Sequence, residues 1–279
     1  MNSPLVTVYI PTKNRHQMLQ RAVQSVLAQD YPNVEIIVVD DGSTLECYEH
    51  NKLVCHLSNN ISLIRNQQSE GACNARNRAI LAAKGEFITG LDDDDEFLPD
   101  RISSFVQSWT TGFSAFCTGY KYILPGGKKI SSSGSEKQIN CEQIKYKNDV
   151  GNQIFTRTSY LKQIGGFDPK LVACQDYDVW IRLICVYGPI QRLAKNNYVV
   201  HQEHEHARIS QFQNRLLGHN ALIAKHKANL NKQQLSSQYF FCALYGGETS
   251  TLKLVKLAGL RHLPVLAKML LIRILSKSK

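Results

Sequence analysis

Short apolar runs alternate with amphipathic stretches over the first hundred residues of the chain. The runs at 5–10 and 35–39 are almost continuously apolar and β-branched, a pattern typical of strands buried on both faces of a parallel sheet. The same pattern predicts further strands at 62–64 and 86–91, and apolar residues at helical spacing predict helices near 23–28 and 72–83. This alternation predicts an α/β domain with a mainly parallel sheet flanked by helices.

The second half of the chain is organised differently. Residues 125–138 are rich in Gly, Ser and Lys, which predicts a mobile loop between a nucleotide half and an acceptor half. Residues 175–186 predict a helix that starts beside Asp176, and the chain beyond residue 219 looks helical and basic. Pro264 is expected to kink or divide the last helical stretch.

The net positive charge of the chain lies at its C-terminal end. Of the 33 basic and 23 acidic residues, 12 basic residues but only one acid, Glu248, follow residue 206. The neutral body argues against a nucleic-acid binder. We therefore expect a domain at 1–225 and a basic helical extension at 226–279, which either lies on an anionic membrane surface or docks on the domain.

The eight cysteines show no CxxC pair and no zinc-finger spacing. The N-terminus has no secretion-signal pattern, and no apolar run approaches the ~20 residues needed to span a bilayer. These features predict a cytoplasmic protein with reduced thiols, no disulfide and no transmembrane anchor.

Polar clusters follow three of the predicted strands, at 11–15, 40–43 and 92–95. Ligands of such sheets bind at the carboxyl ends of the strands, so these clusters are expected to converge. The four consecutive aspartates of the last cluster repel one another, so a positive group must compensate them. Their hard oxygens suit Mg²⁺ or Mn²⁺ holding a diphosphate, and the alternative is a solvated acidic turn.

The motifs together resemble family 2 glycosyltransferases with the GT-A fold, especially bacterial exopolysaccharide enzymes similar to those of colanic acid and O-antigen synthesis. The segments that carry the resemblance are VTVYIPTKNR at 6–15, SVLAQDYPNVEIIVVDDGS at 25–43, GACNARNRAI at 71–80, KGEFITGLDDDDEFLPDR at 84–101 and GNQIF, IGGFD and QDYDVWIRL within 151–183. They extend over most of residues 5–210.

The resemblance implies roles for individual residues. It implies a nucleotide-sugar pocket, with Asp41 on the uracil and Arg76 and Asn77 facing the donor, formed by Pro11, Thr12, Arg15, Asp40, Asp41, Arg76, Asp92 and Asp93. It implies Mn²⁺ or Mg²⁺ at Asp94, with Asp92 and His201 as further metal ligands.

The resemblance also implies a catalytic base. Asp176 stands where inverting members place an aspartate, although Gln175 replaces the usual neighbouring Glu. We interpret Asp178 as structural, near the start of a helix.

A histidine-rich string, His201 to His206, matches no zinc-hydrolase spacing. His204 and His206 are as readily explained as parts of a polar surface loop as by a role near the metal. Arg208 and Ser210 resemble a closing loop that clamps a diphosphate.

These features predict an inverting, metal-dependent hexosyltransferase at the inner membrane. It would move a hexose, with glucose as first choice, from a UDP-sugar to a surface-polysaccharide or undecaprenyl diphosphate-linked acceptor and form a β-linkage. The alternatives are a sugar nucleotidyltransferase, whose glycine-rich loop is missing after the first strand, and a non-catalytic membrane- or polyanion-binding module.

Overall fold

The computed structural model describes residues 3–132, 134–203 and 212–277, with side chains for all of these except 212–213 and 268–277. The chain divides into two compact units. The first comprises Met1–Cys141, Asp149–Pro169 and Asp176–His206, and the second comprises Glu142–Asn148, Lys170–Gln175 and Ala207–Lys279. The domain boundary expected after residue 225 remains a prediction.

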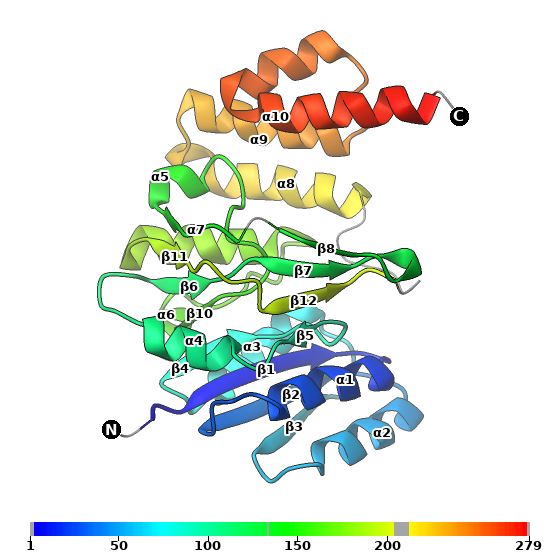
Figure 1. Cartoon of the computed structure of the whole chain (residues 1–279), viewed down its shortest axis with the longest axis vertical. Coiled ribbons are helices and arrows are strands. Elements are labelled where there is room, and N and C mark those ends of the chain that lie inside the picture. The colour runs from blue at the N-terminus through cyan, green and yellow to red at the C-terminus, as the bar shows by residue number, and fades with distance from the viewer. Residues whose placement is uncertain (1–2, 133, 204–211, 278–279) are drawn as a thin grey trace. The chain divides into compact units, whose positions relative to one another are not determined.

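The first unit is built on an eight-stranded sheet with the order β3-β2-β1-β4-β10-β6-β11-β9 (Figure 1). Its strands are β1 (Val6–Thr12), β2 (Val34–Asp41), β3 (Ile61–Asn66), β4 (Phe87–Gly90), β6 (Ala115–Cys117), β9 (Lys137–Ile139), β10 (Phe155–Arg157) and β11 (Ile190–Arg192). The first four run parallel, and β10 inserts antiparallel between β4 and β6. This confirms the predicted, mainly parallel α/β sheet.

Helices cover the sheet because their apolar positions recur at helical spacing. In α1 (His16–Leu27) the buried positions Leu19, Ala22, Val23 and Val26 form one stripe. The other helices of this unit are α2 (Leu45–Cys55), α3 (Ala72–Ala82), α4 (Arg101–Ser108), α6 (Thr158–Gln163) and α7 (Gln175–Tyr187). The main core joins β1, β2 and β4 to α1, α2 and α4.

A smaller, four-stranded sheet has the order β5-β12-β7-β8. Its strands are β5 (Glu96–Phe97), β7 (Tyr120–Ile123), β8 (Lys129–Ser131) and β12 (Tyr198–His201). The expected mobile loop at 125–138 is wrong, because the short η1 (Pro125–Gly127) turns β7 into antiparallel β8 and β9 follows. Gly126 and Gly127 adopt positive φ in that turn, which explains why a glycine-rich stretch forms a hairpin here.

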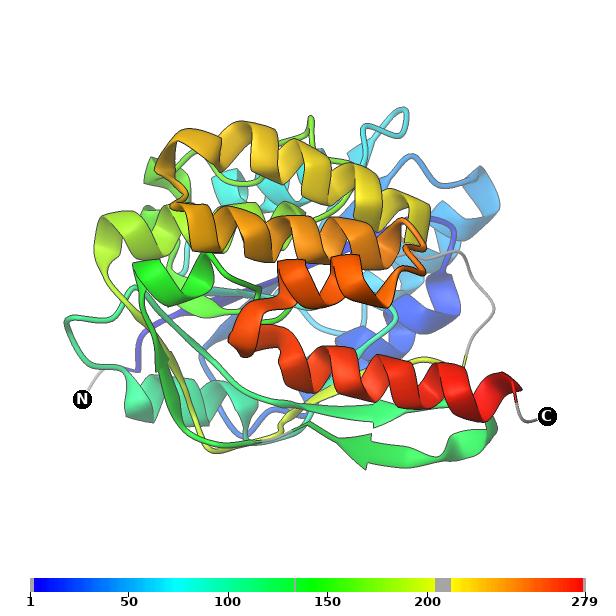
Figure 2. The ribbon, with the colours of Figure 1, turned by 90° about the horizontal axis from the view of Figure 1, so that it is seen from above.

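The second unit contains α8 (Phe212–His226), η2 (Lys227–Asn229), α9 (Lys232–Tyr245) and α10 (Thr251–Lys277). Figure 2 shows α8 beside α9, and α10 bent into two parts. The break lies at Gly259, with φ 52° and ψ −170°, and not at Pro264 as expected. Gly259 has no Cβ and adopts this conformation freely, whereas Pro264 lies only five residues into the renewed helix, where little hydrogen bonding is lost.

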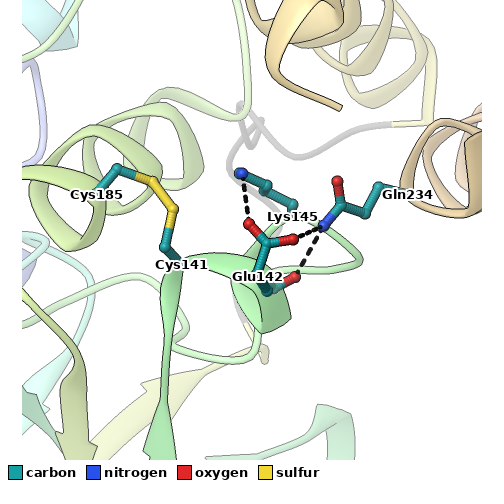
Figure 3. Close-up of a disulfide and its surroundings, with 5 residues drawn as sticks. All are labelled: Cys141, Glu142, Lys145, Cys185 and Gln234. Carbon is teal, nitrogen blue, oxygen red and sulfur yellow. Dashed lines mark hydrogen bonds and ion pairs between the residues drawn. A yellow bond between two sulfur atoms is a disulfide. The ribbon is translucent and has the colours of Figure 1, made fainter. Parts of the chain in front are cut away.

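A disulfide joins Cys141 at the start of α5 (Cys141–Ile144) to Cys185 in α7, so the expectation that all cysteines are reduced thiols is wrong (Figure 3). The two residues are 44 positions apart, and no short-range spacing in the sequence indicates that they pair. The other six cysteines, all within the described residues, take part in no disulfide.

Side chains of α9 hold the segment 142–148 within the second unit. Gln234 donates to the Glu142 carboxylate (2.9 Å), Ser237 to the carbonyl of Tyr146 (2.6 Å) and Gln238 to that of Lys145 (2.6 Å) (Figure 3 for Gln234). Two of these bonds satisfy main-chain carbonyls just after α5, where a helix leaves acceptors without intrahelical partners.

Among the described residues, no helix is both long enough and apolar enough to cross a membrane.

Candidate functional site

The carboxyl ends of β2, β1 and β4 are neighbours in the large sheet and gather most of the predicted site residues. In register, Thr12 pairs with Asp40, and Tyr9 of β1 pairs with Gly90, the last residue of β4. Pro11 pairs with Val39 one step before the edge. The polar clusters of the sequence therefore meet at one edge, as expected for a parallel sheet.

Asp93 turns back toward β1. It accepts a hydrogen bond from the Thr12 hydroxyl (2.7 Å) and forms an ion pair with Arg15 (3.1 Å). Burial raises the pKa of Asp93 to about 7, although Arg15 and Thr12 oppose this shift. Asp93 thus joins the end of β4 to the loop after β1 and presents little surface to a ligand.

Asp94 is placed differently. Arg15 Nη1 lies 3.4 Å from its carboxylate, Arg21 donates to its main-chain oxygen (2.6 Å), and its side chain keeps 16% of its surface exposed. An exposed carboxylate at this edge suits a hard divalent cation.

Asp92 is held by three donors from distant parts of the chain. Arg76 of α3 lies 3.1 Å from Oδ1, and Gln153 and Asn152, just before β10, donate from 3.2 and 3.3 Å. Arg76 and Arg15 therefore supply the positive charge that the sequence required beside the aspartate run. Nothing in the sequence assigned a role to Asn152 or Gln153, and the segment GNQIF was the only signal near them.

Gln153 is almost fully buried and fits closely under β4. A Cβ at Gly90 would meet its Oε1 at 2.1 Å and the Tyr9 ring at 2.5 Å, so only glycine leaves room for this contact. Tyr9 also donates to Gln153 (3.5 Å). The strand therefore ends in glycine because a glutamine beside Asp92 occupies the space of a side chain.

Arg101 supports the aspartate loop from below, and the sequence pattern did not single it out. It is 1% exposed, stacks on Phe97, Phe105 and Tyr198 at 4.8–4.9 Å, and donates to Thr118 and Asn197. Burial lowers its pKa to about 10. The Tyr198 hydroxyl in turn accepts from the Asp92 N–H (3.4 Å).

Asp40 and Asp41 both serve the loops after β2. Asp40 is fully buried and accepts from the Ser43 N–H (2.9 Å) and from Asn51 (2.6 Å). Asp41 accepts from Asn66 and Ser69 (both 2.7 Å) and from the N–H groups of residues 70 and 71 (both 2.9 Å). Burial alone would raise the pKa of Asp41, but these bonds outweigh it and lower the pKa.

Each Asp41 oxygen thus already accepts two hydrogen bonds. A base N–H that approaches this carboxylate must share or displace one of these donors. The loop after β1 is tied to the same place, because the Asn14 N–H donates to the Ser43 hydroxyl (2.9 Å) and Asn14 accepts from the Thr44 N–H (2.8 Å).

Asp176 opens the first turn of α7, where the helix dipole favours an anion. Burial raises its pKa to about 6, the Tyr177 N–H and the charge of Arg76 oppose the rise, and Asp92 adds to it. Asp176 therefore lies within electrostatic range of the Arg76–Asp92 pair. A carboxylate with this pKa is largely ionised at pH 7 and binds a proton readily.

Asp178, two residues later, points away from this group. It is fully buried and forms a bidentate ion pair with Arg182 (2.8 and 2.9 Å). Arg182 also donates to the carbonyls of Ile164 and Gly166 (both 2.6 Å). The structural role expected for Asp178 is confirmed.

Asn77 supports the segment IGGFD. Its amide exchanges two hydrogen bonds of 2.7 Å with the main chain of Phe167. A role of Asn77 toward the donor stays a prediction.

His201 lies between two carboxylates. Nε2 is 2.6 Å from Glu96, Nδ1 is 2.5 Å from Glu203, and its N–H donates to Asp95 (3.1 Å). To bind a metal, one ring nitrogen must leave its carboxylate, and the metal role of His201 stays a prediction. His204, His206, Arg208 and Ser210 lie outside the described residues.

Within the described parts of the chain, no three His, Cys, Asp or Glu side chains form a cluster fit to hold a metal ion. Asp94, with Asp92 beside it, supplies one or two carboxylates. This donor set fits a cation that takes its remaining ligands from substrate phosphates and water.

Comparison with known proteins agrees with this geometry. The model of Glycosyl transferase family 2 matches residues 7–165. WcaA of Escherichia coli K12, named as a colanic acid biosynthesis glycosyl transferase, is 36% identical over 249 residues, which cover 86% of this chain and 87% of WcaA.

A second relative is named for its substrates. WfaP of Escherichia coli, a UDP-Glc:alpha-D-GlcNAc-diphosphoundecaprenol beta-1,3-glucosyltransferase, is 29% identical over 182 residues, which cover 64% of this chain and 70% of WfaP.

Among solved structures, S. aureus TarS 1–349 in complex with UDP-GlcNAc superposes with a TM-score of 0.69 at 19% identity, covering 93% of this chain and 78% of that one. The fold is therefore the GT-A fold, and the chain is an enzyme that belongs to glycosyltransferase family 2.

Proposed function

We propose that the enzyme transfers a hexose, with glucose as first choice, from a UDP-sugar to a hydroxyl of an undecaprenyl diphosphate-linked saccharide and forms a β-linkage. The observation that carries this proposal is the edge of the sheet where Arg76 pairs with Asp92 (3.1 Å) close to Asp94, with Asp176 within electrostatic range of that pair. A base is thus available near charged groups suited to a diphosphate. The substrates named for WfaP support the choice of donor and acceptor.

The reaction is a single displacement. The Asp176 carboxylate takes the proton of the acceptor hydroxyl while that oxygen attacks the anomeric carbon. The bond from this carbon to the diphosphate oxygen breaks, and UDP leaves with the electron pair. Attack opposite the leaving group inverts the α-configured donor to a β-linked product.

The pocket residues have proposed tasks of two kinds. Asp40 and Asp41, with Pro11 and Thr12 beside them, shape the site of the nucleobase at the end of β2. Arg15 and Arg76 orient the diphosphate and compensate its charge. Asp92 and Asp93 anchor these two arginines (3.1 Å each). Arginine suits this work because its guanidinium matches phosphate geometry.

We propose Mn²⁺ or Mg²⁺ as the cofactor, bound by Asp94 with Asp92 and His201 as further candidates. When bound, the ion neutralises charge on the departing diphosphate.

The proposed location follows from the acceptor. An enzyme that uses a lipid-linked saccharide and a UDP-sugar works at the inner face of the cytoplasmic membrane, as a cytoplasmic, peripheral protein. No nucleic-acid partner is proposed, since residues 1–206 carry no net positive charge and the excess of basic residues lies after residue 206.

The donor assignment is tested by thermal unfolding with UDP, GDP, CDP or TDP, each with and without Mn²⁺. A ligand at 100 times its Kd stabilises the native state by about 2.7 kcal/mol, which raises Tm by about 5 °C in a protein of this size. We expect that shift for UDP with Mn²⁺ and a smaller one for the other nucleotides. An equal or larger shift with GDP, or no shift with any nucleotide, contradicts the UDP-sugar assignment.

A further inference from the structure

Both parts of α10, before and after its break at Gly259, expose large apolar side chains. Before the break, Leu252 and Val255 are 81% and 43% exposed, and after it Leu260 and Leu263 are 88% and 40% exposed. The two residues of each pair are three positions apart and therefore share a helix face. We call Leu252, Val255, Leu260 and Leu263 the α10 apolar face.

The α10 apolar face does not belong to the hydrophobic core of the second unit, because α10 contributes other residues to that core. Leu254, Ala258 and Leu266 are at most 3% exposed and pack with Phe240 of α9. His262 is likewise buried against the Phe240 ring. The helix thus has a core-facing side and a separate apolar side that solvent meets, and exposed apolar groups gathered in this way mark interaction surfaces.

Charge indicates which partner suits the α10 apolar face. The sequence from 249 to 279 contains seven basic residues and no acid. Lys256 is exposed in the first part of α10, next to Val255. Two copies of this surface repel each other, whereas an anionic bilayer attracts the lysine and accepts the leucines at its acyl boundary.

We propose that the α10 apolar face, with Lys256 beside it, is the surface by which this chain docks on an anionic lipid bilayer. The leucines enter the boundary between headgroups and acyl chains, and Lys256 meets lipid phosphates. This inference builds on the proposed function, which places the acceptor in the membrane, and it names the part of the chain that reaches it.

The test is co-flotation of the full chain with vesicles of phosphatidylglycerol and phosphatidylethanolamine, and separately with vesicles of phosphatidylcholine. We expect wild type to float with the anionic vesicles. Leu252→Glu/Leu260→Glu is expected to lower the partition coefficient more than about tenfold, because two leucines no longer insert. Lys256→Glu is expected to weaken binding to the anionic vesicles by about fivefold or more.

A matched control is available in the first unit. Leu53 and Leu81 are 65% and 72% exposed on α2 and α3, so Leu53→Glu/Leu81→Glu adds the same charges at equally exposed leucines. We expect this variant to bind vesicles as wild type does. All variants are also tested for stabilisation by UDP and Mn²⁺, which reports the donor site alone.

Vesicle binding that survives Leu252→Glu/Leu260→Glu, or that the control variant loses equally, overturns the proposal. So does a wild-type chain that ignores vesicles but forms dimers dissociated by Leu252→Glu/Leu260→Glu, because a second copy is then the occupant. Face-dependent vesicle binding without any nucleotide stabilisation supports the α10 inference and contradicts the proposed function instead.

Discussion

Asp176→Asn is expected to lower kcat by about 10²–10⁴-fold, the range that a general base contributes, while UDP binding is retained. Asparagine keeps the shape of the side chain at the start of α7 but accepts no proton. Arg76 and Asp92, whose charges act on Asp176, form an ion pair of their own at 3.1 Å. Turnover and the UDP-induced rise in Tm are measured side by side.

Asp178→Asn is the contrasting variant for this experiment. It weakens a buried ion pair with Arg182, so we expect a lower Tm and a modest change in kcat. An Asp176→Asn enzyme with wild-type turnover, or one that fails only because it unfolds, contradicts the assignment of the base.

The pH dependence belongs to the same prediction. The pKa of Asp176 is raised to about 6, and the active form is the carboxylate, so kcat at saturating donor should fall as pH decreases through about 6, by roughly tenfold per unit below it. The residual activity of Asp176→Asn should lack this acidic limb. A limb that persists unchanged in the variant assigns the titration to another group.

Asp94→Ala is the second change with a large expected effect. The Asp94 carboxylate is partly exposed beside Arg15, and its removal should eliminate the part of the UDP stabilisation that requires Mn²⁺ and lower kcat/KM by about two orders of magnitude or more. The readout is the difference in Tm between UDP with and without Mn²⁺.

Asp30→Ala controls for loss of an exposed carboxylate elsewhere and should behave as wild type. If Asp94→Ala keeps the Mn²⁺-dependent rise in Tm, Asp94 is not the metal ligand, and the metal is assigned to other residues, such as Asp92.

The polar residues at the carboxyl edge of the sheet could be predicted because their positions depend on the local pattern of apolar and polar residues. β1 and β2 are continuous apolar runs, so their ends, and the polar residues that follow, can be read directly from the sequence. A positive group beside the aspartates was expected, and Arg15 and Arg76 provide it for Asp92, Asp93 and Asp94. Asp178 could be separated from Asp176 because helix geometry turns residues two apart to different sides.

The contacts that were not foreseen connect distant parts of the chain. Asn152 and Gln153 reach Asp92 across 60 and 61 positions, and the Cys141–Cys185 disulfide spans 44. The sequence assigned no role to Arg101, which three aromatic rings and two polar side chains enclose in the structure. Such contacts depend on the packing of whole elements, which no local spacing encodes.

Two predictions made from the local preferences of glycine and proline were also wrong. The glycines at 126 and 127 form a hairpin turn instead of opening a loop, and Gly259 breaks α10 where Pro264 was expected to do so. In both cases a positive φ, available to glycine at little cost, decides the path of the chain.

The central claim is hexose transfer with inversion from a UDP-sugar to a lipid-linked saccharide. It is tested most directly by incubating the enzyme with UDP-α-glucose, Mn²⁺ and a GlcNAc-diphosphoundecaprenol acceptor, and determining the anomeric configuration of the product by NMR. We predict a single added glucose in β-linkage, formed by wild type and not by Asp176→Asn. An α-linked product, or transfer that Asp176→Asn supports equally, would contradict the account.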